Sequence, residues 1–244
     1  GEGSAFGFAY RIPVIIPVYD IMGNFAGSRG DKLGNAQNPL SMLYRAKDNI
    51  NKRNFFFGNV FGEVDIVKGL MARTSFGARY ENYSGVSFTY PNLEFSEGSA
   101  ANGMSEFQGF NTDWTWTNTL TYKWTVANVH ALTVLAGTEA YQSRNRFLSA
   151  GRNDFFLLGS PDYYYLPAGA SNINNTSSGG VGSLFSIFGR ADYSYLDRYL
   201  VSLTVRRDGS SNFGENNRYG TFPAGSIAWR LSEEGFLKGS SVIT

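Results

Sequence analysis

The chain has 244 residues, enough for one large all-β unit or two small domains. Its formal net charge is +1, so electrostatics gives no reason to expect nucleic acid as a partner. It contains no cysteine, which excludes a disulfide framework and any thiolate metal site.

The composition is compatible with β-structure in contact with lipid. There are 29 Gly, 20 Phe and 15 Tyr but 7 Pro, and aromatic residues make up 16% of the chain. Strands that present aromatic side chains to lipid headgroups use such a composition. No run of about 18 apolar residues occurs, so no transmembrane helix is expected. A secreted β-sandwich or β-propeller would also be rich in Gly and aromatics, and composition alone leaves these classes equal.

The N-terminal part is predicted to be mostly irregular. Residues 1–10 are expected to be the end of a strand. Residues 11–50 are expected to form a long loop, because Pro13, Pro17 and several glycines exclude long regular structure. A short helical turn is expected within 38–50.

A strand pair follows. Residues 55–67 and 70–80 are predicted strands joined by a tight turn at 68–69. The second strand alternates cleanly, with Leu70, Ala72, Thr74, Phe76, Ala78 and Tyr80 opposite Met71, Arg73, Ser75, Gly77 and Arg79. The polar, Gly- and Ser-rich residues 81–110 are predicted to form a long loop, which suits a barrel better than a compact soluble domain.

Residues 113–124 are the clearest strand. One face carries Trp114, Trp116, Leu120, Tyr122 and Trp124, with Asn118 as the exception, and the other carries Asp113, four threonines and Lys123. The ten steps from Trp114 to Trp124 cover roughly 33 Å, which at a tilt of about 40° spans roughly 25 Å. That is the height of the apolar band between two aromatic girdles, so this strand favours a membrane barrel over a sandwich.

The rest of the chain continues the pattern. After a turn at 126–128, residues 130–141 return, with Leu132, Val134 and Ala136 competing with the alternate residues for the apolar face. A second long loop is predicted at 142–182. Three strands follow between 183 and 234, separated by a tight turn at 196–198 and a longer polar loop at 208–217. Short turns at one end and longer loops at the other are typical of an outer-membrane barrel.

These last strands also resemble a known family. The sequence YSYLDRYLVSLTVRRDGSSNFGENNRYGTFPAGSIAWRLSEEGFLK resembles the barrel signature of SusC/RagA-type TonB-dependent outer-membrane transporters. In that family a Tyr-rich strand, a D-R-Y-L turn, an R-D-G-S-S-x-F-G loop and an F-P-A-x-S-x-x-W-R strand occur in this order. The segments IPVYDIMGNFAG with the later N-P-L, and GNVFGEVDIVKGL, resemble further parts of the family. The resemblance runs from about Ile12 to Lys238.

The resemblance implies the architecture. We expect an all-β antiparallel meander of about eight strands, forming part of a transmembrane barrel of about 22 strands with a plugged lumen. The loops near 11–50, 81–110 and 142–182 would be extracellular. Closure of the eight strands into a small barrel is the alternative. Both ends look cut, so the chain is interpreted as an internal barrel segment without the plug and the TonB box.

The resemblance also implies a function. Members import large nutrients, oligosaccharides or peptides, across the bacterial outer membrane with energy from the TonB–ExbB–ExbD complex, and a SusD-like surface lipoprotein lids the barrel. Outer-membrane lipid would surround the wall, and loops 81–110 and 142–182 would touch the lid or the substrate. The alternative is a secreted or outer-membrane β-rich binding module or adhesin with no transport role.

No catalytic, cofactor or metal site is expected, and the protein is interpreted as not an enzyme. His130 is the single histidine and lies beside a turn, and no G-x-S-x-G, H-E-x-x-H or P-loop motif occurs. The aspartates between Asp20 and Asp65 are too scattered for an EF-hand-like calcium site.

The candidates for ligand contact are Tyr163, Tyr164 and Tyr165, because exposed aromatics stack on sugar rings or pack on peptides. The alternative is that they brace their loop. The charged residues opposite the aromatic faces are predicted to pair within a barrel wall or contact a plug rather than bind substrate: Arg73, Arg79, Lys123, Arg190, Asp192, Arg206 and Arg230.

Overall fold

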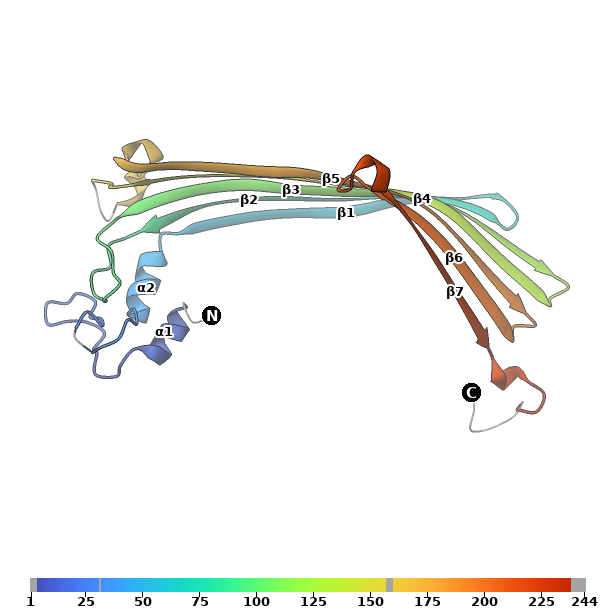
Figure 1. Cartoon of the computed structure of the whole chain (residues 1–244), viewed down its shortest axis with the longest axis horizontal. Helices are drawn as coiled ribbons and strands as arrows, with labels where there is room; N and C mark the ends of the chain where they lie inside the picture. The colour runs from blue at the N-terminus through green and yellow to red at the C-terminus, as the bar shows by residue number, and fades with distance from the viewer. Residues whose placement is uncertain (1–3, 31, 157–159, 238–244) are drawn as a thin grey trace. The chain divides into compact units, whose positions relative to one another are not determined.

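The computed structural model describes residues 4–30, 32–156 and 160–237. Its strands form one antiparallel sheet in the order β1-β2-β3-β4-β5-β6-β7, each paired with the next along the chain (Figure 1). The strands are β1 Ile50–Val67, β2 Leu70–Thr89, β3 Gly103–Val126, β4 His130–Asn153, β5 Ser171–Tyr195, β6 Tyr199–Ser210 and β7 Tyr219–Trp229. The predicted antiparallel meander is confirmed. The sheet has seven strands, one fewer than the sequence indicated.

The helices account for the missing strand. Residues expected to end a strand form α1, Ala5–Arg11, instead, because Ser4 caps the helix: its Oγ accepts the N–H of Gly7 at 3.1 Å. The expected helical turn is α2, Pro39–Ala46, with Pro39 in its first turn. Short 3₁₀ turns lie at Pro161–Tyr163, Leu166–Ala168, Glu215–Asn217 and Leu231–Glu233. Within the described residues, no helix is long and apolar enough to cross a membrane.

The two predicted long loops are shorter than expected. Strand β2 continues to Thr89 and β3 begins at Gly103, so the connection is 90–102 and not 81–110. Likewise β4 continues to Asn153 and β5 begins at Ser171, so the second connection is 154–170 and not 142–182. Main-chain hydrogen bonds form the ladder whatever the side chains are, so polar, Gly-rich sequence can pair where no apolar face is needed.

The tight turns are confirmed. Gly69 has φ 85°, and both central residues of the other two turns have positive φ: Ala127 50° and Asn128 56°, and Leu196 54° and Asp197 56°. Two consecutive left-handed residues make a type I′ turn, whose twist matches that of the strands it joins. Short hairpins of this kind fix the register of the meander.

The chain divides into two compact units, which are described separately. Unit 1 comprises Gly1–Asn54, Asn82–Phe110 and Arg146–Ser178, and unit 2 comprises Phe55–Glu81, Asn111–Asn145 and Gly179–Thr244. Unit 1 contains the two helices and the connections 90–102 and 154–170. Unit 2 contains the tight turns and parts of every strand. Among the described residues, all buried hydrophobic side chains belong to unit 1: Ala36, Phe95, Met104, Phe155 and Tyr164.

Candidate functional site

The sheet of unit 2 has two chemically different faces. We call the first the aromatic face; its exposed side chains include Phe76, Tyr80, Trp116, Leu120, Tyr122, Trp124, Val134, Ile187, Tyr193, Tyr195, Tyr199, Leu203, Val205, Tyr219, Ile227 and Trp229. We call the second the charged face, with Glu63, Arg73, Arg79, Asp113, Glu139, Arg190, Asp192, Arg206 and Asp208. Alternation along the strands separates them, and the register of β5, β6 and β7 keeps equivalent residues side by side. Strand β1 is the exception, because its exposed Phe61 lies on the charged face, 4.4 Å from the Arg73 guanidinium.

Aromatic rings form a row at the tight-turn end of the aromatic face. The ring of His130 lies 5.1 Å from that of Tyr195, Tyr195 lies 6.3 Å from Tyr199, and Tyr199 lies 6.2 Å from Trp229. His130 Nδ1 also lies 2.7 Å from the Tyr193 hydroxyl. His130 is therefore one member of an aromatic row.

A second set of rings lies at the other end of the same face. Phe76 and Trp114 stack at 6.1 Å. Between the two sets lie mostly aliphatic and small side chains. Trp114 and Trp124 are ten residues apart on β3, so the rings bracket a band of about 25 Å on a tilted strand. This spacing matches the two interfaces of a bilayer.

The sequence left two details of the aromatic face undetermined: the facing of residues 130–141 and the role of Asn118. Trp114 Nε1 donates to Gln142 Oε1 at 3.3 Å, whereas Thr117 donates to Glu139 at 3.2 Å on the other face. Alternation from Gln142 therefore places Leu132, Val134 and Ala136 on the aromatic face. The exceptional Asn118 is satisfied within the sheet, because its Oδ1 accepts from the Thr74 hydroxyl at 2.7 Å, and Trp116 Nε1 donates to the same hydroxyl at 2.9 Å.

The charged face is paired internally. Arg73 lies 2.5 Å from Glu63, Arg79 lies 2.8 Å from Asp113, and Arg190 lies 2.8 Å from Asp192. Arg230, near the tight-turn end, pairs with Asp197. The predicted pairing is confirmed for these arginines; Lys123 has no ion pair among the described residues.

Arg206 links three strands of the charged face. Its Nη2 donates to Glu139 at 2.7 Å and to Ser186 Oγ at 2.9 Å, and its Nε donates to Asp208 at 2.7 Å. Its guanidinium also lies 5.4 Å from the Phe188 ring. Two carboxylates on β4 and β6 are thus neutralised by one planar donor, an arrangement that suits arginine and not lysine.

Unit 1 contains a set of hydrogen bonds around Asn38, here called the Asn38 clamp. These bonds explain the Y-D-x-x-G-N motif at residues 19–24. Asp20 Oδ1 accepts the N–H groups of Met22 and Asn24 at 2.9 and 2.8 Å, which closes a turn. Asn38, 2% exposed, donates to the carbonyls of Val18 and Ala26, both at 2.8 Å. Its Oδ1 accepts from the N–H groups that begin α2. One side chain therefore fastens the motif and caps the helix.

Glu94 joins this clamp to the 90–102 connection. Its carboxylate pairs with Arg45 through both oxygens and accepts from the Ser41 hydroxyl at 2.9 Å. Burial alone would raise the pKa of Glu94, but the hydrogen bonds from Arg45 and Ser41 hold it below its usual value. Nearby, burial and a hydrogen bond to Asp48 raise the pKa of Tyr90. This centre was not predicted from the sequence, because its partners lie far apart along the chain; the Asn38-Pro39 dipeptide before a helix was the available signal.

The three candidate tyrosines separate into two groups. Tyr163 and Tyr165 are 68% and 65% exposed, whereas Tyr164 is 5% exposed. The ring of Tyr164 stacks on Phe155 at 4.7 Å and lies 5.6 Å from Phe88, within a small cluster that includes Met104. Tyr164 braces the 154–170 connection, so ligand contact stays a prediction for Tyr163 and Tyr165 alone.

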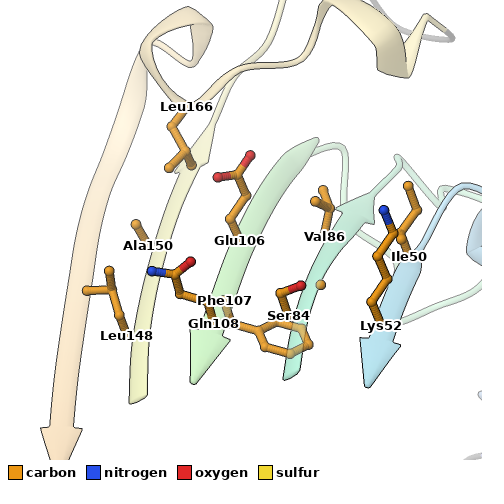
Figure 2. Close-up of a pocket in the computed structure, with 11 residues that line it drawn as sticks. Ile50, Lys52, Ser84, Val86, Glu106, Phe107, Gln108, Leu148, Ala150 and Leu166 are labelled. Carbon is orange, nitrogen blue, oxygen red and sulfur yellow. The ribbon is translucent and has the colours of Figure 1, made fainter. Parts of the chain in front are cut away.

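A pocket of about 460 Å³ lies over the strand ends of unit 1 (Figure 2). Figure 2 shows Leu166, from the 154–170 connection, above Glu106 of β3. The lining combines Lys52, Ser84, Glu106 and Gln108 with apolar side chains such as Val86 and Leu148. The pocket was not predicted from the sequence, because the segments of β2, β3 and β4 that line it fall within the predicted loops 81–110 and 142–182.

Comparison with known proteins identifies the family. No protein-family model matches the chain. The chain is 32% identical over 249 residues to the TonB-dependent receptor P3 of Formosa agariphila. This match covers 100% of the chain and 24% of that receptor. The chain is also 32% identical over 219 residues to the TonB-dependent receptor SusC of Bacteroides thetaiotaomicron, covering 85% and 20%. The chain is related to the SusC/RagA-type TonB-dependent transporters.

Solved structures agree at the level of fold. A structure of the RagAB peptide transporter matches with a TM-score of 0.76 at 20% identity, over 90% of this chain and 24% of that one. A RagAB peptide importer in the closed-closed state matches with a TM-score of 0.71 at 22% identity, over 90% and 24%. This SusC/RagA-type chain therefore spans about a quarter or less of the relatives' length. Its antiparallel sheet has the fold of a segment of these structures.

The family signature now has a location. In this SusC/RagA-type chain the D-R-Y-L element, residues 197–200, begins in the type I′ turn between β5 and β6 and continues into β6. The D-G-S-S element ends β6, where Ser211 Oγ accepts the N–H of Ser183 at 2.9 Å and Ser210 Oγ accepts that of Asn212 at 3.2 Å. The hydroxyls stabilise the edge of a loop, so these signature residues have a structural role.

Proposed function

We propose that the protein containing this chain imports large nutrients across the bacterial outer membrane, with energy supplied through TonB. The observation that carries the proposal is the pair of opposite faces in unit 2, one aromatic and aliphatic and the other charged but paired. Such strands suit a wall with lipid on one side and water on the other. The relatives named TonB-dependent receptors support the same function.

In this proposal the chain supplies strands of the barrel wall and the connections between them that face the outside of the cell. The charged face lines the lumen, where its ion pairs stay solvated, and the aromatic face contacts lipid. The tight turns lie on the periplasmic side and the connections 90–102 and 154–170 on the outside, as in other outer-membrane barrels. The plug, the TonB box and the contact with TonB–ExbB–ExbD belong to parts of the protein outside this chain.

We assign the contact with a SusD-like lipoprotein lid, or with the substrate beneath it, to the 154–170 connection. Tyr163 and Tyr165 project there as exposed rings, a chemistry that stacks on sugars or packs on peptides. The substrate class is therefore oligosaccharide or peptide.

Uptake by whole cells tests the proposal. Cells with and without the gene are supplied with labelled oligosaccharide and peptide pools, in parallel with cells that lack TonB. We expect uptake of one pool to be lost in both deletions and restored by the gene. Uptake that survives loss of TonB would contradict energy coupling, and uptake that survives loss of the gene would contradict transport.

The tyrosines are tested in the same cells. We expect the double variant Tyr163→Ala and Tyr165→Ala to lower uptake several-fold while leaving the protein in the membrane, since each aromatic ring that stacks on the substrate contributes about 1 kcal/mol. Tyr10→Ala is the matched control, because Tyr10 is 96% exposed in the same unit. Equal uptake by the double variant and the control would remove these tyrosines from the site.

A further inference from the structure

The aromatic face of unit 2 has an uneven charge distribution. Across the described strands of this unit, its positions carry two charged side chains, Arg144 and Arg207, and no carboxylate. The opposite face carries charges of both signs, and its ion pairs hold Arg73, Arg79, Arg190 and Arg206. Among the described residues, no carboxylate lies within ion-pair distance of Arg144 or Arg207, and both side chains are exposed.

Both arginines lie at the end of the face away from the tight turns. Arg144 is two residues beyond Gln142, which bonds Trp114. Arg207 lies between Arg206 and Asp208 of the charged face, so it points to the aromatic side, and its guanidinium sits 5.0 Å from the Tyr219 ring. Tyr219 and Trp229 stand at opposite ends of β7, so Arg207 lies at the end of this face away from the tight turns.

At the tight-turn end a carboxylate contacts the row of rings. There Glu234 accepts hydrogen bonds from Tyr199 at 2.8 Å and Trp229 at 3.1 Å. Aromatic girdles mark the depth of lipid headgroups. The carboxylate at the tight-turn end, Glu234, is paired with Arg198 at 3.3 Å, whereas the cations at the far end of the face have no ion-pair partner among the described residues.

We propose that Arg144 and Arg207 bind the phosphates of anionic lipid headgroups in the membrane leaflet at that end. A guanidinium matches phosphate oxygens with parallel hydrogen bonds, and basic residues at a membrane surface attract anionic lipid. An arginine aimed at bulk lipid without a carboxylate partner needs such an anion, because an uncompensated charge beside hydrocarbon is costly. The inference goes beyond the proposed transport activity and rests on the same barrel orientation.

Lipid binding to the complete transporter tests it. The protein is purified in neutral detergent, and bound phosphatidylglycerol is titrated by native mass spectrometry, with zwitterionic phosphatidylcholine in parallel. We expect Arg144→Gln and Arg207→Gln each to weaken phosphatidylglycerol binding by about fivefold and the double variant by the product. The double lysine variant, Arg144→Lys with Arg207→Lys, should retain most of the affinity.

Three controls make the result decisive. Lys123→Gln removes an exposed cation from the other face and should leave affinity unchanged. Inorganic phosphate should not displace the lipid, which separates a headgroup from a free anion. The proposal is overturned if the double variant binds within twofold of the parent, if Lys123→Gln loses as much, if phosphatidylcholine binds equally well, or if inorganic phosphate displaces the lipid. Heat-modifiable gel mobility verifies folding, and uptake assays separately report transport.

Discussion

Asn38 concentrates four hydrogen bonds in one buried side chain. Asn38→Ala would leave the carbonyl of Ala26 and the two N–H groups that begin α2 without these partners, whereas the Val18 carbonyl would keep the N–H of Ala26 at 3.1 Å. Each orphaned group costs about 1 kcal/mol or more, so we expect a loss of about 3 kcal/mol in local stability. Hydrogen exchange of residues 12–49 in the complete protein measures it.

Asn38→Asp separates the two roles of this residue. The carboxylate keeps the helix cap but loses the amide that donates to two carbonyls. We expect α2 to stay protected while the segment near Val18 and Ala26 opens. Equal protection in the aspartate variant and the parent would show that the amide contributes nothing.

Glu94 makes the same region sensitive to acid. Because its folded pKa lies below the ordinary glutamate value, its contribution is complete at neutral pH and is lost as pH falls from about 4.5 through the folded pKa. Removing one partner of a pair this buried costs about 3 kcal/mol, and Glu94→Gln should open 12–49 even at neutral pH. Limited proteolysis across this pH range follows both effects. Glu97→Gln is the control, since Glu97 accepts one exposed bond from Asn35.

At the scale of elements, Arg206 ties β4, β5 and β6 together on the charged face. Arg206→Lys keeps the charge but cannot serve Glu139, Asp208 and Ser186 with one planar fork. The side chain is 38% exposed, so screening limits the loss to about 1–2 kcal/mol. We expect a lower temperature of heat-modifiable unfolding, and nearly the same shift for Arg206→Met. An unchanged unfolding temperature for Arg206→Lys would contradict the need for a planar guanidinium at this position.

Glycines in the strands are not equivalent. A Cβ on Gly109 would lie 2.5 Å from the Tyr83 ring and 2.7 Å from the Arg146 carbonyl, whereas one on Gly58 meets nothing within 4 Å. Gly109→Val should therefore destabilise the barrel by about 2 kcal/mol through overpacking, and Gly58→Val should be neutral or slightly stabilising. Thermal unfolding of both variants distinguishes backbone crowding from a general intolerance of side chains.

Much of the arrangement of strands and hairpin turns was predictable from the sequence. Alternation defined the strand faces wherever one face is apolar, as in 113–124, and turn residues located the hairpins. It failed at 81–89, 103–110 and 142–153, where the sequence shows no regular apolar alternation. There the strands continue through main-chain hydrogen bonds and through tertiary packing, such as that of Phe88 and Met104 near Tyr164. The Asn38 and Glu94 clamp was also invisible, because it joins residues separated by tens of positions and depends on tertiary folding.

At the scale of the whole molecule, the aromatic face of unit 2 leaves large apolar side chains such as Trp116, Trp124 and Ile227 exposed. Exposed apolar surface of this kind promotes association, so we expect the 244-residue chain, produced alone, to aggregate in water and to remain dispersed with β-type circular dichroism in detergent. A monomeric, detergent-free chain would favour the binding-module alternative.

The tight turns and the longer connections also determine where the chain tolerates added length. A type I′ turn such as Ala127–Asn128 allows no extra residue without shifting the register of both strands. The connections 90–102, 154–170 and 211–218 have no such constraint, apart from the anchors at Glu94 and Tyr164. An epitope tag placed in 211–218 should therefore be accepted and accessible to antibody on intact cells, whereas one placed at 127–128 should prevent assembly. Diversity among related proteins should accumulate at the same connections, leaving the hairpin turns uniform in length.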